Sequence, residues 1–495
     1  MFTKILIANR GEIAVRIMRT CREMGIATVA VYSDADSRSL HVLSADQAVH
    51  IGDAEPSKSY LDIDKIIDAA KSTGAEAIHP GYGFLAENAV FAERCESSGL
   101  TFIGPPPQVI RDLGDKITAR KIMTAGGVPV IPGTEEGIDD ISAVSADAAK
   151  IGYPLLVKAA AGGGGKGMRV VYDPTDLEEA CASASREAAG AFGNGTIFIE
   201  KYLSPSRHVE FQILADSFGN VIHLNERECS IQRRHQKIIE ETPSPVMTPE
   251  LRQKMGEAAV AAARASGYVN AGTVEFIVDN QGMFYFLEVN TRLQVEHPVT
   301  EMTTGIDLVR YQISIAAGEK LSLDQKDISA KGHAIECRIY AEDPEQGFFP
   351  SPGIIHYMKE PSGPGIRNDC GVYTGFPVPF EYDPIVSKLV VHGNTRKDAI
   401  SRMIRALQEY IILGIKTPVP FLIDVLKSEP FVNGETYTDF IDTHFSDWSM
   451  DRKNMHTAQI AFLVDDMLPL KKQVSHGDGI LSTPSPWQTL GNWRL

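Results

Sequence analysis

The segment from residue 284 to residue 298 constrains the fold and the chemistry of this chain more than any other segment. Residues 283–287 are continuously apolar, which is typical of a strand buried on both faces. From Glu288 onward every second residue is polar, and in an extended chain such residues lie on one face. Fully extended, residues 288–296 would span roughly 26 Å at about 3.3 Å per residue, which is too long for one site. We therefore expect a strand that ends near Asn290 and a bent loop after it.

The polar residues of this segment are chemically mixed: they are Glu288, Asn290, Arg292, Gln294 and Glu296. Mg²⁺ takes oxygen ligands, often one or two carboxylates together with substrate phosphates, and Glu288 and Asn290 can supply such oxygens. Arg292 offers a planar fork for a small oxyanion, and Glu296 is a candidate base beside it. An amphipathic edge strand with a wet face is the alternative interpretation of the alternation alone.

A second carboxylate is expected close to Glu288. Residues 271–276 form a candidate strand that would pair with residues 283–289, so that Glu275 and Glu288 face one another across the two strands. Two carboxylates held that close repel unless a dication lies between them. The pairing therefore predicts a site for Mg²⁺ or Mn²⁺.

The composition is that of an ordinary globular protein, with 43% hydrophobic and 23% charged residues. A chain of 495 residues predicts about three domains. The net charge of −16 argues against nucleic acid or an acidic membrane as a partner. The six cysteines are scattered without a C-x-x-C pair, and there is neither an apolar run of about 18 residues nor a signal peptide. We therefore expect reduced core thiols and a cytoplasmic protein.

Strands and helices alternate over about the first 110 residues. Apolar strands are expected at 4–8, 28–32 and 77–79, with a helix after the first strand and another around 63–70. Such alternation predicts a doubly wound parallel sheet. The G-x-G-x-x-G turn is absent after the first strand, which argues against a dinucleotide site. The loop 80–84 follows a strand at the end of the sheet where ligands bind, but a plain turn explains its residues equally well.

Another landmark is a run of five glycines within residues 162–167, between apolar segments at 154–157 and 168–171. Glycine leaves backbone N–H groups free to approach phosphate, and Lys166 adds a positive charge. No G-K-[ST] opens a helix here, so the run is not a P-loop. The strand–loop–strand arrangement predicts a lid over a nucleotide, although a mobile hairpin without a ligand also fits.

Several motifs follow one another in a fixed order along the chain. They are the glycine run, Gln232-Arg-Arg-His-Gln-Lys237, Glu288-x-Asn-x-Arg-x-Gln-Val-Glu-His-Pro298, Glu336-Cys-Arg338 and Phe349-Pro-Ser-Pro-Gly353. Together they resemble the motifs of the biotin carboxylases, a branch of the ATP-grasp ligases. The resemblance covers about residues 1–445.

The resemblance implies an α/β protein of three domains and a tail. The N-terminal Rossmann-like domain (1–114) would contain the doubly wound parallel sheet. The central ATP-grasp domain (115–330) would carry the mobile glycine-rich lid at about 131–203. A C-terminal domain (331–445) would be mostly antiparallel β with helices, and the tail (446–495) is a candidate partner-docking segment.

The resemblance also assigns roles to individual residues. At ATP it places Lys116, Lys158, Gly163, Gly164, Gly165, Lys166, Glu200, Lys201, Leu203, His208, Gln232 and His235, with Glu200, Lys201 and Leu203 at the adenine. The metal ligands would be Glu275, Glu288 and Asn290. Bicarbonate would be bound by Lys237, Arg292, Gln294 and Val295 and deprotonated by Glu296. Arg338 would stabilise the enolate of biotin, and Tyr82 would lie near the biotin pocket.

The activity implied by the resemblance is the ATP- and bicarbonate-dependent carboxylation of biotin through carboxyphosphate, the first half-reaction of an acyl-CoA or pyruvate carboxylase. The chain has no Met-Lys-Met biotin-attachment motif and too few further residues for a carboxyltransferase. We therefore expect two separate partners, a biotin carboxyl carrier protein and a carboxyltransferase subunit. The carboxyltransferase would choose the final acceptor. The resemblance also implies a homodimer.

Two alternatives from other classes stay open. Another ATP-grasp carboxylate or bicarbonate ligase would share the lid and the metal ligands but would not need Arg338. A non-catalytic regulatory subunit would be expected to lack the metal carboxylates, yet Glu275 and Glu288 are present.

The tail holds all three tryptophans of the chain, Trp448, Trp487 and Trp493. Tryptophan is favoured at binding hot spots. A stripe of apolar residues at helical spacing precedes Pro469: Ile460, Leu463, Val464, Met467 and Leu468. The tail also resembles the segment that, in multidomain acyl-CoA carboxylases, leads from the biotin carboxylase toward the carrier region. We expect it to dock the separate carrier or carboxyltransferase subunit; packing on its own body is the alternative.

Overall fold

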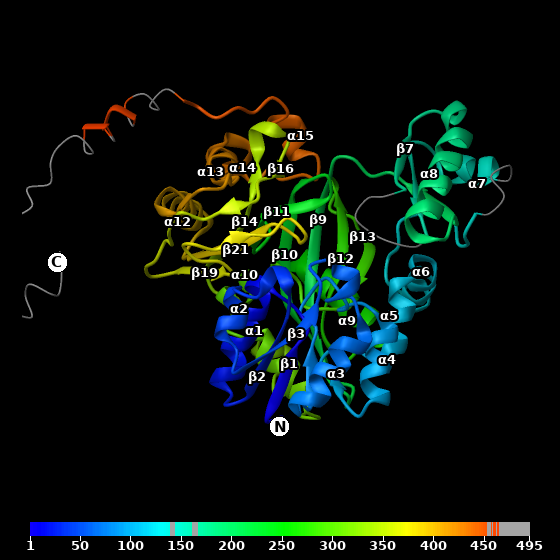
Figure 1. Cartoon of the computed structure of the whole chain (residues 1–495). Helices are drawn as coiled ribbons and strands as arrows, with labels where there is room; N and C mark the ends of the chain where they lie inside the picture. The colour runs from blue at the N-terminus through cyan, green and yellow to red at the C-terminus, as the bar shows by residue number, and fades with distance from the viewer. Residues whose placement is uncertain (139–143, 161–166, 453–456, 458, 462, 465–495) are drawn as a thin grey trace, which may run out of the picture. The chain divides into compact units, whose positions relative to one another are not determined.

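The computed structural model describes residues 1–138, 144–160, 167–452, 457, 459–461 and 463–464. The chain forms two compact units, Met1–Trp448 and Ser449–Leu495. Figure 1 follows the chain by colour and labels the main helices and strands.

The N-terminal part is built on a five-stranded parallel sheet with the strand order β3-β2-β1-β4-β5. Ile5 and Ile7 of β1 pack with helix α1 on one face, whereas Leu6 packs with helix α3 on the other. A continuously apolar strand is what a sheet covered on both faces requires, because successive side chains point to opposite faces. The predicted doubly wound sheet is confirmed. Its elements are β1 (Lys4–Ile7), α1 (Gly11–Glu23), β2 (Ala27–Ser33), α2 (Leu40–Ser44), β3 (Gln47–Gly52), α3 (Ile63–Thr73), β4 (Ala77–His79), α4 (Ala89–Ser97) and β5 (Thr101–Phe102).

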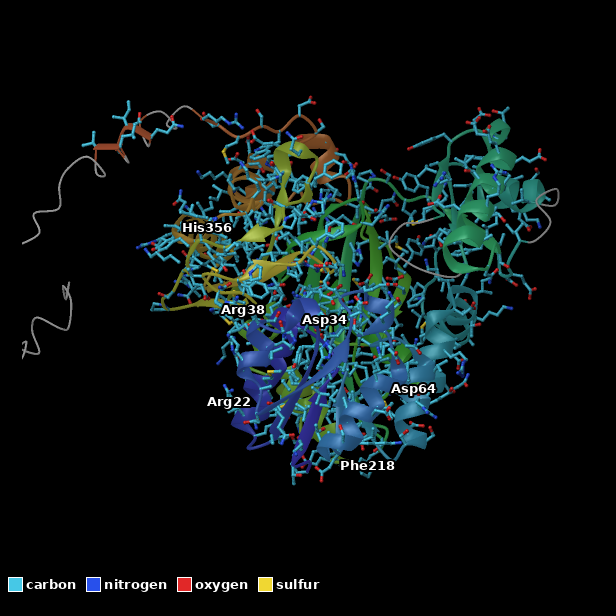
Figure 2. All side chains as sticks on the ribbon, in the orientation of Figure 1. Arg22, Asp34, Arg38, Asp64, Phe218 and His356 are labelled. Atoms are coloured by element: carbon cyan, nitrogen blue, oxygen red, sulfur yellow. The ribbon has the colours of Figure 1, made fainter. Side chains whose placement is uncertain are left out.

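An eight-stranded antiparallel sheet runs through the central and C-terminal parts in the order β13-β12-β9-β10-β11-β14-β21-β19. In the pairing of β11 with β14, Ile239 lies opposite Cys337, so the sheet continues across residue 330. Phe218, in the turn between β9 and β10, is exposed (Figure 2). The strands are β9 (Ser206–Ala215), β10 (Val221–Arg233), β11 (Gln236–Thr242), β12 (Asn270–Asp279), β13 (Phe284–Asn290), β14 (His333–Tyr340), β19 (Ile366–Cys370) and β21 (Ile385–Gly393).

Helices cover both faces of this sheet. Met255 and Ala259 of helix α9 pack against Phe211 and Phe276, whereas Val299 of α10 packs against the β14–β21 part of the sheet. These and neighbouring helices are α5 (Pro107–Gly114), α6 (Lys116–Ala125), α9 (Pro249–Ala265), α10 (His297–Thr304), α11 (Leu308–Ala316) and α12 (Arg396–Glu409).

Residues 144–201 carry a separate small sheet with its own core. The order is β7-β6-β8, and Val157 of β6 packs with Cys181 and Ala184 of helix α8. Strands β6 and β7 flank the glycine run as predicted, but residues 161–166 lie outside the described residues. The elements are α7 (Val144–Ile151), β6 (Leu155–Ala159), β7 (Arg169–Val171), α8 (Leu177–Phe192) and β8 (Ile197–Lys201).

The C-terminal end of the first unit differs from the expectation for the tail. Trp448 lies with its ring centroid 5.2 Å from that of Phe421, and its Nε1 donates to Asp424 at 2.8 Å. Of the three tryptophans expected in the tail, Trp448 therefore packs on helix α13 of the first unit and is not available to dock a partner. The remaining elements are β15 (Glu342–Asp343), β16 (Phe349–Pro350), β17 (Gly353–Ile354), β18 (Tyr357–Lys359), β20 (Pro377–Val378), β22 (Ile411–Leu413), α13 (Val419–Lys427), α14 (Glu429–Asn433) and α15 (Phe440–His444).

In the second unit, the described residues 457, 459–461 and 463–464 are helical. Ile460, Leu463 and Val464 are 60%, 54% and 49% exposed. The predicted helix is therefore confirmed where it is described, whereas Met467, Leu468, Trp487 and Trp493 lie outside the described residues. Among the described residues, none of the helices is long and apolar enough to cross a membrane.

Candidate active site

A cavity of about 730 Å³ brings together residues that lie far apart in the sequence. Its walls come from the loop after β4, the start of α6, and strands β9 to β14 of the eight-stranded sheet. Most of the predicted site residues line it: Tyr82, Lys116, Lys158, His208, Gln232, His235, Lys237, Glu275, Glu288, Asn290, Arg292, Gln294, Val295 and Arg338.

Four predicted residues that the structure describes do not line this cavity. Glu296 is completely buried next to the cavity. Glu200, Lys201 and Leu203 are not among the lining residues. Gly163, Gly164, Gly165 and Lys166 lie outside the described residues.

The end of β13 sets the geometry of the carboxylates. Glu275 of β12 lies opposite Glu288 of β13, and β13 ends at Asn290, both as predicted. Burial raises the pKa of Glu288, and the charge of Glu275 raises it further. Burial would also raise the pKa of Glu275, but Lys237 and His208 hold it below its usual range. Asn290 Nδ2 donates to Glu275 Oε1 at 2.8 Å.

This donor set fits a hard divalent cation. Glu275 and Glu288 present carboxylate oxygens to the cavity, and the repulsion that raises the Glu288 pKa is what a dication would relieve. Asn290 Oδ1 accepts from Arg292 Nη2 at 2.9 Å, so its oxygen is already engaged. The two carboxylates are therefore the stronger candidates for metal ligands.

Lys237, which lines the cavity, contacts three carboxylates. Its Nζ lies 2.5 Å from Glu210 Oε2, 2.8 Å from Glu275 Oε1 and 2.7 Å from Glu296 Oε1. Burial would lower the pKa of Lys237, but the three carboxylates raise it well above its usual range. The amino group of Lys237 is therefore protonated at neutral pH, and it fixes the position of Glu296.

Glu210 is a further functional candidate, which the sequence motifs do not single out. It is fully buried in β9 and also accepts from Arg227 Nε at 2.5 Å. The signal was present, because a carboxylate within a strand of otherwise buried residues requires a cationic partner.

Arg338 holds the other side of Glu296. Its Nη2 donates to Glu296 Oε2 at 2.9 Å, and its Nε donates to Glu240 Oε1 at 2.6 Å. Burial would raise the pKa of Glu296, but Lys237 and Arg338 lower it well below its usual range. Glu296 is therefore ionised, as a base must be, while its two cationic partners make it a weak one.

Arg292 is fixed by a residue from the N-terminal part. Its Nε donates to Glu87 Oε2 at 2.8 Å, and its Nη1 donates to Gln294 Oε1 at 3.0 Å. Glu87 Oε1 also accepts from the backbone N–H of Thr291 at 3.0 Å. The sequence does not indicate Glu87, because the contact joins residues 205 positions apart. The Arg292 guanidinium is thus held at the start of the loop that follows β13.

The lysines predicted at ATP differ in their surroundings: Lys116 and Lys158 line the cavity, whereas Lys201 does not. Lys158 Nζ lies 2.6 Å from Glu200 Oε1, and both side chains are buried. Lys201 Nζ instead donates to the carbonyl of Tyr153 at 2.7 Å, so its side chain is bound to the turn before β6. Burial lowers the pKa of Lys116 at the start of α6, and nearby Lys158 lowers it further. Lys116 and Lys158 thus form a cationic pair that suits phosphate oxygens.

The side of the cavity near Tyr82 is also polar. The Tyr82 hydroxyl donates to Glu12 Oε1. Glu12 Oε2 lies 3.3 Å from Lys388 Nζ, and both side chains are fully buried. His208 Nε2 lies 2.9 Å from Glu275 Oε2, so the predicted ATP ligand is held against a predicted metal ligand.

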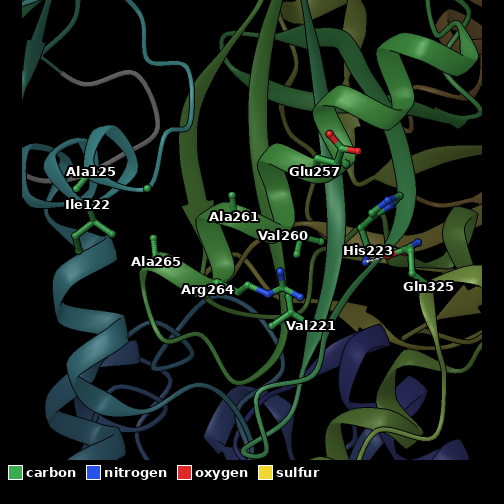
Figure 3. Close-up of a pocket in the computed structure, with 12 residues that line it drawn as sticks. Ile122, Ala125, Val221, His223, Glu257, Val260, Ala261, Arg264, Ala265 and Gln325 are labelled. Atoms are coloured by element: carbon green, nitrogen blue, oxygen red, sulfur yellow. Dashed lines mark hydrogen bonds between the residues drawn. The ribbon is translucent and has the colours of Figure 1, made fainter.

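A second cavity of about 930 Å³ lies between α6, α9 and the start of β10 (Figure 3). Its charged lining residues are Glu257 and Arg264, and none of the predicted site residues lines it. Mostly small apolar side chains from the two helices form its walls. The chemistry is therefore concentrated in the first cavity.

Comparisons with known proteins agree with this geometry. Three family models match the chain: "Biotin carboxylase, N-terminal domain" over residues 1–110, "Carbamoyl-phosphate synthase L chain, ATP binding domain" over 115–324, and "Biotin carboxylase C-terminal domain" over 336–443. Biotin carboxylase 1 of Bacillus subtilis is 53% identical over 445 residues, covering 90% of this chain and 99% of the relative. The biotin carboxylase of a Nostoc species is 54% identical over 441 residues, covering 89% of this chain and 98% of the relative.

A solved structure shares the fold. It is the biotin carboxylase domain dimer of the Hydrogenobacter thermophilus 2-oxoglutarate carboxylase, in complex with MgADP, ADP and bicarbonate. The TM-score is 0.88 at 48% sequence identity, and the match covers 91% of this chain and 99% of that chain.

Proposed function

The chain belongs to the biotin carboxylase family, and from this membership we propose which of its residues carry each step of the reaction. The protein is an ATP-dependent ligase that uses bicarbonate to carboxylate biotin on a separate carrier protein. The single observation that carries the residue assignment is the position of Glu296. This buried carboxylate bridges Lys237 and Arg338, which line the same cavity as Glu275 and Glu288.

The nucleotide would occupy the side of the cavity that carries the cationic pair. Lys116 and Lys158 would bind phosphate oxygens, with His208, Gln232 and His235 beside them. The glycines Gly163, Gly164 and Gly165 together with Lys166 would cover the phosphates, and the backbone near Glu200, Lys201 and Leu203 would receive the adenine. Mg²⁺ or Mn²⁺, held by Glu275 and Glu288 with Asn290 beside them, would neutralise charge on the phosphates.

Bicarbonate would bind between Arg292 and Lys237, with Gln294 and Val295 completing the site. Glu296 accepts the bicarbonate proton, a bicarbonate oxygen attacks the γ-phosphorus, and ADP leaves, which gives carboxyphosphate. Lys237 and Arg338 both lower the basicity of Glu296. The proton transfer therefore requires that at least one of these cations turns toward the substrate anion.

Carboxyphosphate would then break down to CO₂ and phosphate. The phosphate takes the proton from N1 of biotin, and N1 attacks CO₂ to give carboxybiotin. Arg338, which lines the same cavity as Tyr82, would stabilise the negative charge that develops on the ureido oxygen. Catalysis is mostly positioning and charge neutralisation in a buried site.

The domain organisation follows the family models. We assign residues 1–114 to the N-terminal domain, 115–330 to the ATP-grasp domain with a lid at about 131–203, and 331–445 to the C-terminal domain. The matched ranges 1–110, 115–324 and 336–443 support these bounds. The eight-stranded sheet is continuous across residue 330 and carries site residues from both of the last two domains.

The partners would be a biotin carboxyl carrier protein, a second copy of this chain and a carboxyltransferase subunit. The related biotin carboxylase domain from Hydrogenobacter thermophilus forms a dimer, which supports a homodimer here. The six cysteines, all described, are unpaired and buried, which supports a reducing compartment such as the cytoplasm. The exposed helix face at Ile460, Leu463 and Val464 supports docking of the tail on the polypeptide that carries the carboxyltransferase.

ATP cleavage with purified protein tests the proposal. ADP release should require bicarbonate and should rise when free biotin is added. A rate that is independent of bicarbonate would instead favour another ATP-grasp ligase, and no turnover with any addition would favour a regulatory subunit.

A further inference from the structure

One face of β14 borders a buried polar layer next to the active-site cavity. On this face Arg338 lies opposite Lys388 of β21, and Glu336 lies opposite Glu240 of β11. Directly opposed residues of an antiparallel pair point to the same side of the sheet, with Cβ atoms about 4.5–5.5 Å apart. Helix α10 packs on this side through Val299. Glu336 is therefore the cross-strand neighbour of the carboxylate that holds Arg338.

Glu336 and Glu240 are both completely buried. Both carboxyl oxygens of Glu336, and Oε2 of Glu240, have no hydrogen-bond partner among the residues that the structure describes. A buried ionised carboxylate without donors is costly, and two facing carboxylates cannot both stay ionised cheaply. A single proton held between them would satisfy oxygens on both residues.

The two cations that face Glu336 are engaged with other acceptors. Lys388 Nζ donates to the carbonyl of Val295 at 2.8 Å and lies 3.3 Å from Glu12 Oε2. Arg338 donates from Nε and Nη2 to two other carboxylates, those of Glu240 and Glu296. Neither cation therefore satisfies the Glu336 carboxyl group.

The balance of charges favours a neutral Glu336. Burial raises the pKa of Glu336 well above its usual range, Lys388 and Arg338 oppose that rise, and the charges of Glu240 and Glu296 add to it. Burial also raises the pKa of Glu240, to about 7, but Arg338 opposes the rise there through a direct hydrogen bond. Between the two acids, the proton belongs on Glu336.

We propose that Glu336 is a positioning residue that stays protonated and donates its O–H to Oε2 of Glu240. Oε1 of Glu240 accepts from Arg338 Nε at 2.6 Å, so the two hydrogen bonds form a row from Glu336 through Glu240 to the guanidinium. The row fixes the direction of Arg338, whose Nη2 reaches Glu296 at 2.9 Å. The inference deepens the proposed function and rests on the role given there to Arg338.

The row has a consequence at high pH. Ionisation of Glu336 would place two like charges on neighbouring strands and remove the donor to Glu240. The charged groups with the largest effect on Glu336 are Glu240 on β11, Arg338 on β14, Lys388 on β21 and Glu296 at the start of α10. Since both cations are engaged, repulsion would displace Glu240 and loosen Arg338. Biotin-dependent turnover should fall before ATP cleavage does.

Infrared spectroscopy tests the protonation state directly. A protonated carboxylic acid has a C=O stretch that an ionised carboxylate lacks. At about pH 8 the wild type should show one such band that is missing from the spectrum of Glu336→Gln. An ordinary Glu is ionised at this pH and does not give the band. If no protonated-acid band is lost, Glu336 is ionised and the proposal is overturned.

Kinetics test the positioning role with a matched pair of variants. Glu336→Gln keeps a neutral donor for Glu240, so biotin carboxylation should stay within about threefold of wild type. Glu336→Leu removes the donor and leaves Glu240 Oε2 unsatisfied, so kcat/KM for biotin should fall about tenfold or more. Biotin-independent ATP cleavage should fall much less in the leucine variant. In Glu336→Gln, the alkaline loss of biotin-dependent activity should also disappear.

Arg338→Ala is the reference variant that separates the proposed role of Arg338 from that of Glu336. If it lowers biotin carboxylation and biotin-independent ATP cleavage equally, the proposed role of Arg338 fails, while the infrared result still decides where the proton resides. If it acts on biotin carboxylation alone but Glu336→Leu lowers both reactions equally, only the positioning role fails. If Glu336→Gln is as harmful as Glu336→Leu, a charge is needed at this position and the proposal is wrong. Should the leucine variant not fold, the infrared spectrum and the pH profile of Glu336→Gln decide.

Discussion

The Nζ atom of Lys237 lies 2.7 Å from Oε1 of Glu296, inside a site where Glu296 has no exposed surface. This ion pair couples the candidate base to the candidate metal ligands, because the same ammonium group also contacts Glu275 at 2.8 Å. A cation held by three carboxylates keeps them together without a dication, and arginines are further partners of two of them, Glu210 and Glu296. The place for further positive charge is therefore the Glu275–Glu288 pair, and the place for an anion is near Arg292.

Replacing the candidate base should separate binding from turnover. Glu296→Gln keeps the shape of the side chain but cannot accept the bicarbonate proton. Bicarbonate-dependent ATP cleavage should fall by about 10²–10⁴-fold, the usual contribution of a general base. ADP binding, measured by calorimetry, should change little, since Lys116 and Lys158 are untouched. A variant that keeps more than about a tenth of the wild-type rate would contradict the assignment.

The contact between Arg292 and Glu87 predicts a defect specific to bicarbonate. Glu87→Ala removes the acceptor of Arg292 Nε at 2.8 Å and frees the guanidinium to move. KM for bicarbonate should rise about tenfold, the effect of losing one charged hydrogen bond, while KM for ATP changes little. Glu93→Ala is the matched control, because Glu93 pairs with exposed Arg111 at the same 2.8 Å. Equal effects of the two substitutions on bicarbonate would show that Glu87 does not position Arg292.

The strand patterns of the site could be predicted from the sequence, since they depend on local alternation. The facing pair Glu275 and Glu288 and the end of β13 at Asn290 follow from which residues of two adjacent strands are apolar. The partners Glu210, Glu240 and Glu87 could not be chosen in the same way. Glu240 and Glu87 reach their arginines across 98 and 205 residues of sequence, and Glu210 reaches Arg227 and Lys237 through the pairing of strands β9, β10 and β11.

The alternation does not determine which strands of the large sheet become neighbours. Strand β11 pairs with β14 almost 100 residues later, and this pairing alone brings Glu240 next to Arg338 and Glu336. Trp448 is a related case. The sequence places it at the start of the tail, whereas in the structure its partners are Phe421 and Asp424 of the first unit. The positions of buried charges were the available signal, because each of them requires a partner of opposite charge or a proton.

A buried acid outside the active site predicts a pH-dependent stability. Burial raises the pKa of Glu228 from 4.5 to about 7, while Arg207 and hydrogen bonds from Ser230 and Ser244 oppose the rise. Because the folded pKa is the higher one, its contribution to stability is full below about pH 4.5 and is lost as the pH rises through about 7.

Glu228→Gln should remove this loss. The free energy of unfolding of the variant, relative to wild type, should increase between about pH 5 and pH 8, by on the order of 3 kcal/mol at about 1.4 kcal/mol per pKa unit. Urea titrations at both pH values measure it. Glu319→Gln, at an exposed position, is the control and should follow wild type. Parallel pH profiles of wild type and Glu228→Gln would contradict a raised pKa.

The tail provides the last prediction, and the packing of Trp448 fixes where it should be cut. Because Trp448 belongs to the first unit, residues 449–495 are the segment to delete. The truncated protein should keep its melting temperature and its carboxylation of free biotin, because every described residue of the active-site cavity lies before position 449. Co-purification with the carboxyltransferase subunit should weaken, since the exposed apolar helix face can be buried against a partner.

The double variant Leu463→Asp, Val464→Asp should weaken this co-purification as well, whereas Val90→Asp, at a similarly exposed position of the first unit, should not. Normal assembly of the truncated protein would rule out docking through the tail, and loss of its folding would mean that the tail instead packs on its own body.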